Sequence, residues 1–379
     1  MDSQCDESVN LFGGAEYVCR TLAELGYCAY IVGGAVRDTL MGKAPKDYDI
    51  ATSARPDKVT EIFESRGISV IPTGIKYGTV TVRLHDKTMY EVTTFRTDGI
   101  YSDGRRPEAV TFSDSIEDDL ARRDFTMNAI AMSVTDGREF IDPFGGRYDI
   151  ERGIIRCVGD ARTRFCEDAL RIIRAVRFRA VTGFSIAPDT AHAIVECVPM
   201  LKNIAKERIT SEWIKILESE RPETLAGLRG LKRLTPDFRV RLAAAYLCGK
   251  GCGKPDEVRD DLRELKLSSD DYHAVLRIYC ACGSLMQCDS GDIAAMKRIL
   301  AEFGVEATQR SAEIIRVCFA SAHDCEIDRI IASGEPYLLK HLAIDGGDLL
   351  YKFPGISGKL TGKLLDMCLS RVKSHLVAI

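Results

Sequence analysis

The hydrophobic pattern divides the chain into a mixed N-terminal part and a helical remainder. Thr79–Leu84 (TVTVRL) and Met89–Phe95 (MYEVTTF) alternate apolar and polar positions, which predicts two strands joined by a turn. Ser8–Leu25 and Pro56–Arg66 carry apolar residues at helical spacing and predict amphipathic helices. From about residue 165 the helical spacing dominates, in runs such as EDALRIIRAVRFRA and SEWIKILES. The pattern therefore predicts an α+β fold, with a mixed head over residues 1–150 and helical domains after it.

Shorter segments complete the expected head. Cys28–Val32 is an apolar run typical of a short strand, and Phe140–Gly146 (FIDPFGG) predicts a strand followed by a turn. Arg96–Arg106 holds charges and glycines but few apolar residues, so it predicts a mobile loop.

The composition is that of a soluble globular protein. The chain has 379 residues, of which 45% are hydrophobic and 28% charged. It has no apolar run near the roughly 20 residues that a membrane span needs, and its acidic start, MDSQCDESVN, is unlike a signal peptide. We therefore expect a cytoplasmic protein whose 14 scattered cysteines are reduced thiols.

Charge is distributed unevenly along the chain. The formal net charge is −4, which argues against indiscriminate binding to nucleic acid. Residues 151–180, however, hold eight arginines against four acidic residues. Such a basic stripe suits a polyanionic substrate such as a nucleotide or RNA, although a solvated helix face has the same composition.

Asp47 and Asp49 are candidate metal ligands. They are two residues apart in a stretch that reads as a strand (YDIAT), so both carboxylates are expected on one face. Carboxylates together with substrate phosphates are the usual ligands of Mg²⁺, and two such ions can assist transfer to a phosphoryl group. The pair alone is also compatible with a solvated loop.

The sequence before these acids adds candidate phosphate-binding groups. Gly33 and Gly34 follow the apolar run YIV, where small residues let backbone N–H groups approach a phosphate, and Arg37 follows at helical reach. The spacing matches neither a dinucleotide-binding GxGxxG motif nor a P-loop. Glycine turn, arginine and convergent acids together indicate nucleotidyl transfer.

Two further stretches carry candidate nucleotide contacts. In RRDFTMNA (122–129), adjacent arginines are expected to open a helix and, with Asn128 one turn on, to grip a triphosphate and ribose. A structural pairing of arginine with aspartate is the alternative for this stretch. In EDALRIIRAVR (167–177), Asp168 and Arg171 are expected to be neighbours at i,i+3 on one helix. Their carboxylate and guanidinium suit the Watson–Crick edges of C and A, but not those of G and U. An ordinary intrahelical ion pair is the alternative.

These motifs carry a resemblance to a known family. GGAVRD…DYD, RRDFTMNA and EDALRIIR resemble, in order, the signature motifs of class II tRNA nucleotidyltransferases, the CCA-adding enzymes, which share a bacterial family with poly(A) polymerases. The likeness is strong over the head and neck and weaker beyond, where LAIDGGDLL (342–350) is similar to the tail of the family. It implies a polymerase-beta-like nucleotidyltransferase head (1–150), a helical neck that recognises the nucleotide (151–218), a helical body (219–310) and a tRNA-binding tail (311–379).

The resemblance also implies roles for individual residues. Asp47 and Asp49 match the catalytic, metal-binding carboxylates, and Glu91 is a weaker candidate for a third. Two Mg²⁺ ions, CTP and ATP as substrates, and the 3′ end and elbow of tRNA as partners are implied with them. The positions that match nucleotide contacts are Gly34, Arg37, Arg123, Asp168, Arg171, Arg174 and Arg177.

The specific activity has alternatives. Poly(A) polymerases of the family often carry an Arg-Arg-Phe stretch that is missing from PTGIKYGTVTV (72–82), which favours CCA addition. Residues 96–112 resemble the flexible loop of enzymes that add all three nucleotides, so CC-adding or A-adding activity alone is less favoured. An RNA-binding protein without catalysis and a small-molecule nucleotidyltransferase are further alternatives. The pair His323–Asp324 does not predict the second metal site that some family members carry.

Overall fold

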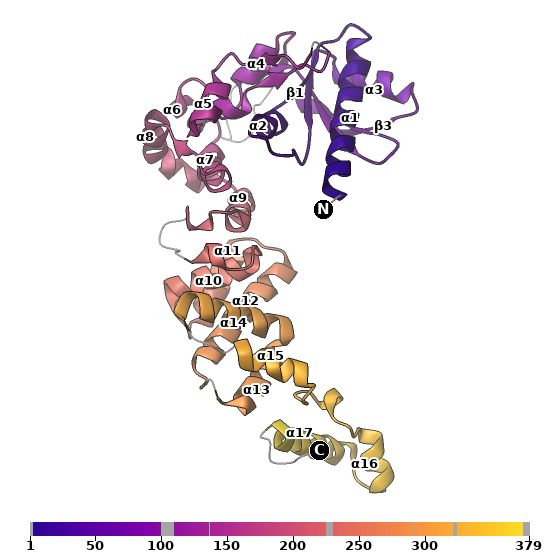
Figure 1. The fold of residues 1–379 in the computed structure, drawn as a ribbon, viewed down its shortest axis with the longest axis vertical. Helices are drawn as coiled ribbons and strands as arrows, with labels where there is room; N and C mark the ends of the chain where they lie inside the picture. The colour runs from indigo at the N-terminus through magenta and orange to yellow at the C-terminus, as the bar shows by residue number, and fades with distance from the viewer. Residues whose placement is uncertain are drawn as a thin grey trace. The chain divides into compact units, whose positions relative to one another are not determined.

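The protein is described by a computed structural model that covers residues 3–99, 110–135, 137–224, 230–289, 291–320 and 324–373. The chain divides into two compact units, Met1–Ala205 and Lys206–Ile379 (Figure 1). The fold class expected from sequence is confirmed, because a mixed sheet with helices is followed by helices alone. The four-part division into head, neck, body and tail stays a prediction.

The first unit is built on a seven-stranded mixed sheet. The strand order is β3-β4-β5-β2-β1-β8-β9, and β2 and β5 are its parallel pair. Its strands are β1 (Ala29–Val32), β2 (Asp49–Thr52), β3 (Ser69–Gly74), β4 (Thr79–Arg83), β5 (Met89–Thr94), β8 (Ala131–Met132) and β9 (Phe140–Ile141).

Helices pack on both faces of this sheet. One face meets α1, α2 and α3 in an apolar core that includes Val18, Ile50 and Phe63, and the other face packs on α4 through Leu120. The helices of the unit are α1 (Ser3–Ala23), α2 (Gly34–Leu40), α3 (Pro56–Glu64), α4 (Ile116–Ala121), α5 (Gly146–Arg152), α6 (Ala161–Glu167), α7 (Leu170–Thr182) and α8 (Pro188–Cys197).

Two small sheets complete the first unit. β6 (Arg96–Asp98) pairs antiparallel with β7 (Val110–Phe112), and β10 (Ile154–Ile155) pairs parallel with β11 (Ser185–Ile186). The loop expected over Arg96–Arg106 is therefore wrong at its start, where Arg96 donates a hydrogen bond to the carbonyl of Tyr77 and lies beside Asp98. Gly99 follows β6 without regular secondary structure, and residues 100–106 lie outside the described residues.

The second unit is helical. The helices between residues 206 and 333 share one apolar core, with fully buried residues such as Val275 on α12 and Ile314 on α14. The helices of the unit are α9 (Lys206–Glu218), α10 (Phe238–Lys250), α11 (Pro255–Glu264), α12 (Ser269–Met286), α13 (Ile293–Phe303), α14 (Val305–Phe319), α15 (Asp324–Ser333), α16 (Gly346–Lys352) and α17 (Gly358–Lys373). No helix in the described ranges is long and apolar enough to cross a membrane.

Most of the expected elements of the head are present. The helix expected over Ser8–Leu25 is α1, which starts earlier, and the strands expected near Thr79 and Met89 are β4 and β5. The strand β3 was not expected, because Pro72 lies inside it. A proline cannot donate to a ladder, and β3 tolerates it as an edge strand.

Candidate active site

The connection between β1 and α2 brings three candidate groups together. Gly33 has φ 73° and ψ −127°, a conformation that glycine adopts without steric cost. A Cβ atom placed on Gly33 would lie 2.8 Å from Nη1 of Arg123 and 3.9 Å from Oδ2 of Asp49. The arginine and the aspartate therefore meet over this glycine. Gly34, the glycine expected to contact nucleotide, opens α2 near Arg37.

Asp49 lies at the start of β2, and the neighbouring strand β5 carries a second acidic residue, Glu91. Ile50 pairs with Val92 in the parallel register of β2 and β5, which places Asp49 beside Glu91. Asp49 as a whole is exposed to solvent, but its carboxyl group is surrounded by protein atoms. This desolvation raises the pKa of Asp49 to about 6. Arg123 opposes the rise, and the charges of Asp47 and Glu91 add to it.

The expected placement of Asp47 on the same strand is wrong. The strand begins only at Asp49, so Asp47 lies in the preceding loop. Its charge still reaches the carboxyl group of Asp49, as the raised pKa of Asp49 records. The two acids are thus brought near each other by the end of a loop and not by strand alternation.

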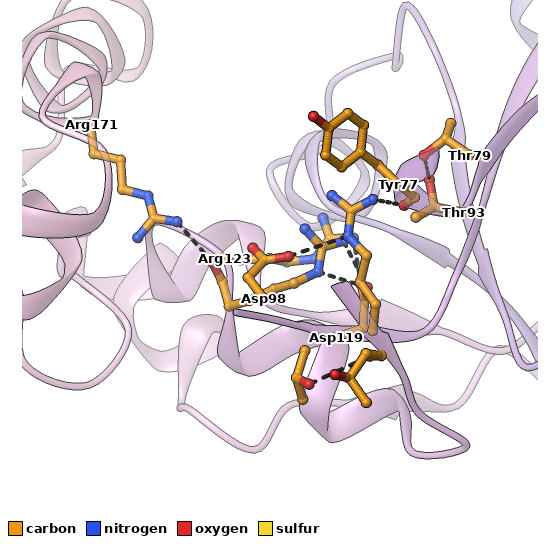
Figure 2. A network of polar contacts seen from close by, with 11 residues as sticks. Tyr77, Thr79, Thr93, Asp98, Asp119, Arg123 and Arg171 are labelled. Carbon is orange, nitrogen blue, oxygen red and sulfur yellow. Dashed lines mark hydrogen bonds and ion pairs between the residues drawn. The ribbon is translucent and has the colours of Figure 1, made fainter. Parts of the chain in front are cut away.

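Arg122 and Arg123 follow a helix and do not open one. α4 ends at Ala121, and both guanidinium groups turn back to the buried carboxylate of Asp119, at 2.7 Å for Arg122 and 3.1 Å for Arg123. Figure 2 shows Arg123 and Asp119. Burial alone would raise the pKa of Asp119, but the charges and hydrogen bonds of the two arginines outweigh it and hold this pKa below its ordinary value. Asp119 therefore remains a carboxylate that fixes Arg123.

Arg123 retains donor capacity beyond this ion pair. Its Nε is buried and has no hydrogen-bond partner among the described residues, while its Nη1 lies over Gly33. A buried N–H without a partner is costly, and an anion is a suitable partner. Arg123 is thus arranged as a donor to a negatively charged group next to Asp49.

A polar chain connects Arg37 of α2 with Arg174 of α7. Nη1 of Arg37 donates to Oδ1 of Asn128 (2.8 Å), and Nδ2 of Asn128 donates to Oδ1 of Asp124 (3.2 Å). Nε of Arg174 donates to Oδ2 of Asp124 (2.8 Å). Burial would raise the pKa of Asp124, but Arg174 and the hydrogen bonds from Asn128 and Arg174 hold it below its ordinary value. Arg177 lies beside this chain on α7, with its guanidinium over the ring of Phe178.

The expected pairing of Asp168 with Arg171 on one helix is wrong. α6 ends at Glu167, and Asp168 has an extended backbone (φ −145°, ψ 102°) before α7 begins at Leu170. Oδ1 of Asp168 accepts a hydrogen bond from the backbone N–H of Leu170 (3.0 Å), the first residue of α7, in a local turn that precedes the helix.

Arg171 has other partners. Its Nη1 donates to Oε2 of Glu167 (2.6 Å) and to the carbonyl of Arg164 (3.1 Å). Its Nη2 donates to the carbonyl of Arg122 (3.1 Å), a bond that Figure 2 shows reaching across from α7. Arg171 is therefore buried, and it links α7 to the stretch that contains Arg122 and Arg123.

Sequence reasoning did not select several residues that hold this site together. They are Asp119, Asp124, Glu167 and Phe178. Asp119 could have been found from the sequence, because it precedes Arg122 and Arg123 by three and four residues, which is helical pairing distance. Phe178 is the aromatic residue between Arg177 and Arg179, but nothing in the sequence shows that its ring faces arginines.

No second metal site is found in the described ranges. They contain no group of three or more His, Cys, Asp or Glu side chains that could hold a metal ion. His323 lies outside the described residues. Asp47, Asp49 and Glu91 therefore do not form a three-ligand cluster, and a metal here would depend on the aspartates together with oxygen atoms of a substrate.

Comparison with known proteins decides the family. Residues 29–156 match the poly A polymerase head domain, and residues 183–235 match the probable RNA and SrmB-binding site of polymerase A. The chain is 37% identical to the CCA-adding enzyme of Lactiplantibacillus plantarum over 95% of its own length and 92% of that protein. The chain belongs to the CCA-adding enzyme family. The resemblance seen in the three sequence motifs is thereby confirmed.

Other family members show the same relation. The CCA-adding enzyme of Geobacillus stearothermophilus is 52% identical over 60% of this chain, and the match spans only 57% of that relative's length. The crystal structure of Bacillus stearothermophilus CCA-adding enzyme in complex with CTP superposes with a TM-score of 0.80, at 35% identity, over 97% of this chain and 93% of that one. A Thermotoga maritima CCA-adding enzyme complexed with tRNA, 21% identical, shares the fold with a TM-score of 0.59 over 98% of this chain and 93% of that one.

Proposed function

We propose that this protein adds C, C and A to the 3′ end of tRNA, using CTP and ATP and releasing pyrophosphate. One observation carries the proposal: the guanidinium of Arg123 and the carboxyl group of Asp49 meet over Gly33. A donor to phosphate and a candidate metal ligand at one backbone turn are what nucleotidyl transfer requires. The relatives are named CCA-adding enzymes, which supports addition of C, C and A, and a protein of the same fold is complexed with tRNA.

Asp47 and Asp49 are the proposed ligands of two Mg²⁺ ions. The fit rests on the donor chemistry, because hard carboxylate oxygens suit Mg²⁺, which usually takes one or two of them plus substrate phosphates. Burial raises the pKa of Asp49, with smaller contributions from the charges of Asp47 and Glu91, and a bound cation would favour the ionised form of this carboxyl group. When bound, the ions supply activation of the attacking hydroxyl and stabilisation of charge on the leaving oxygens.

The arginines, Gly34 and Asp168 have separate proposed roles. Arg37 and Arg123 hold phosphate oxygens, and Gly34 contributes backbone at the start of α2. Arg174 and Arg177 flank the base and the triphosphate. Asp168 and Arg171 read the base edge, with the carboxylate accepting from an exocyclic amine and the guanidinium donating to a ring nitrogen. The 3′ hydroxyl of tRNA attacks the α-phosphorus, and the bond to pyrophosphate breaks.

Addition of all three nucleotides is the preferred form of the activity. The relatives compared above are named CCA-adding enzymes, and the Arg-Arg-Phe stretch typical of poly(A) polymerases is missing. The segment 100–109, which belongs to the proposed C-to-A switching loop, lies outside the described residues. We further propose a cytoplasmic location and contact of the tail with the elbow of tRNA.

An extension assay tests this function. The protein is incubated with Mg²⁺ and a tRNA that lacks its 3′ CCA. CTP and ATP together should extend the tRNA by a limited C, C, A sequence, and CTP alone should stop at the two cytidines. Long A tails would instead identify a poly(A) polymerase, and a stop after C, C in the presence of ATP would identify a CC-adding enzyme. No transfer of either nucleotide would leave only an RNA-binding role.

A further inference from the structure

Phe178 collects the guanidinium groups of three arginines around one aromatic ring. The ring lies on α7 and is 3% exposed. The guanidinium carbon of Arg177 is 4.0 Å from the ring centroid, that of Arg37 is 5.2 Å away, and that of Arg174 is 5.4 Å away. A cation within about 6 Å of an aromatic centroid is attracted by the negative charge of the ring face.

These arginines come from two separate parts of the chain. Arg37 belongs to α2, directly after the glycine turn, whereas Arg174 and Arg177 belong to α7. The like charges of the three guanidinium groups repel one another, although Arg37 is paired with Asp38 and Arg174 with Asp124. An aromatic ring that all three guanidinium groups share offsets this repulsion and fixes their spacing without competing for their N–H donors.

The ring is itself held in place. It packs edge-to-face against Phe125, with centroids 5.6 Å apart and an interplanar angle of 83°, and Phe125 is fully buried. The backbone N–H of Phe125 donates to Oδ1 of Asp124 (2.8 Å), and Asp124 is the acid that binds Arg174. One dipeptide, Asp124–Phe125, thus supports Arg174 through a carboxylate and Phe178 through an aromatic contact.

We propose that Phe178 is a positioning residue that aligns Arg37 with Arg174 and Arg177 for binding of the incoming nucleotide. The inference rests on the proposed function, in which these arginines contact the nucleotide. Phe178 is not one of the two residues proposed to read the base. Its loss should therefore weaken CTP and ATP equally, whereas a base-reading residue should change the selectivity between bases.

Direct binding of CTP and ATP, measured by calorimetry on the full-length protein with Mg²⁺ and without tRNA, tests the proposal. Phe178→Leu and Phe178→Met remove the ring, and the Met variant nearly conserves side-chain volume. Each should raise Kd for both nucleotides about tenfold, the equivalent of one lost, largely desolvated cation–π contact. Phe178→Tyr keeps the ring and should restore Kd to near the wild-type value.

Phe165→Leu is the matched control for the loss of a buried phenylalanine. Phe165 lies on α6 and is fully buried, and the described part of the chain places no guanidinium over its ring. This variant should lower Tm as Phe178→Leu does, and leave Kd for both nucleotides unchanged.

Three results would overturn the proposal. They are an unchanged Kd in Phe178→Leu and Phe178→Met, a change confined to one nucleotide, or an equal change in the Phe165→Leu control. Failure of the function proposed above is distinguishable, because it would show in the wild-type protein as missing nucleotide binding or missing tRNA extension. If Phe178→Leu does not fold, the Phe178→Met variant decides the question.

Discussion

Asp119 holds two adjacent arginines from one fully buried position. Its Oδ1 accepts from Arg122 and its Oδ2 from Arg123, so both oxygens are used. Arg122 is the C-cap of α4, and the backbone N–H of Arg123 donates to the carbonyl of Leu120 (3.2 Å). The carboxylate then determines where the guanidinium group of Arg123 lies relative to Gly33.

Asp119→Asn should destabilise the unit Met1–Ala205 at neutral pH by about 2 kcal/mol, because two guanidinium groups lose their compensating charge. The folded-state pKa of Asp119 is depressed, so its stabilising effect is present above the unfolded-state pKa of about 4 and is lost as pH falls through the lower folded-state pKa. Chemical denaturation between pH 7 and pH 3 measures the difference. A gap between wild type and variant that widens at low pH would contradict the assignment.

Asp168 combines a local hydrogen bond to the backbone with a proposed base contact, and the two roles can be separated. Asp168→Asn keeps an oxygen for the N–H of Leu170 but adds an N–H₂ donor, which suits the carbonyl groups of U and G. Incorporation of UTP and GTP relative to CTP and ATP should rise, with tRNA affinity unchanged. Competition assays measure the ratio, and Asp189→Asn on the exposed start of α8 is the control. Unchanged selectivity in Asp168→Asn would remove Asp168 from base reading.

At the scale of elements, the sequence was informative where hydrophobic periodicity is long and uninterrupted. The alternation in β4 and β5 and the helical spacing of α1 and α3 were enough to predict them. Helix ends were harder to predict. The break between α6 and α7, for example, contains neither glycine nor proline. There Asp168 and Ala169 interrupt an otherwise helical pattern, and the side chain of Asp168 accepts a hydrogen bond from the backbone N–H of Leu170. Local side-chain hydrogen bonds of this kind leave no periodic signal.

A buried ion pair connects two elements of the second unit. Nζ of Lys297 on α13 is fully buried and lies 2.6 Å from Oε2 of Glu335, which follows α15. Glu335→Gln leaves the ammonium group without its compensating charge and should destabilise this unit by about 3 kcal/mol. Lys297→Met, which replaces the charge with an apolar side chain, should cost much less.

Urea denaturation of the two variants measures these effects. Glu326→Gln is the control, because its partner Arg329 is half-exposed and such surface pairs contribute at most about 1 kcal/mol. A larger loss in Lys297→Met than in Glu335→Gln would contradict the argument that the uncompensated charge is what costs stability.

At the scale of the whole molecule, most of the residues proposed to bind nucleotide could be identified from the sequence. The contacts that these residues make with one another could not. Arginines dense between residues 151 and 180, an acidic pair and a glycine pair are visible in the sequence. The contacts that connect them join residues far apart in the chain, as in Arg37–Asn128 and Arg171–Arg122. Such tertiary hydrogen bonds depend on the sheet order, which periodicity does not encode. All of these groups lie within the unit Met1–Ala205.

The most direct test of the central claim is single-turnover transfer by Asp49→Asn on a tRNA that lacks CCA, with Mg²⁺ and CTP. Transfer should fall by more than about a hundredfold, while the affinity for tRNA stays the same. Mutation of residues that only hydrogen-bond to a metal ligand already lowers activity by up to about a hundredfold, and Asp49 is proposed to be a ligand itself. Asp57→Asn, at the exposed start of α3, is the matched control and should transfer normally. Transfer by Asp49→Asn at a near-normal rate would contradict the assignment of this site to nucleotidyl transfer.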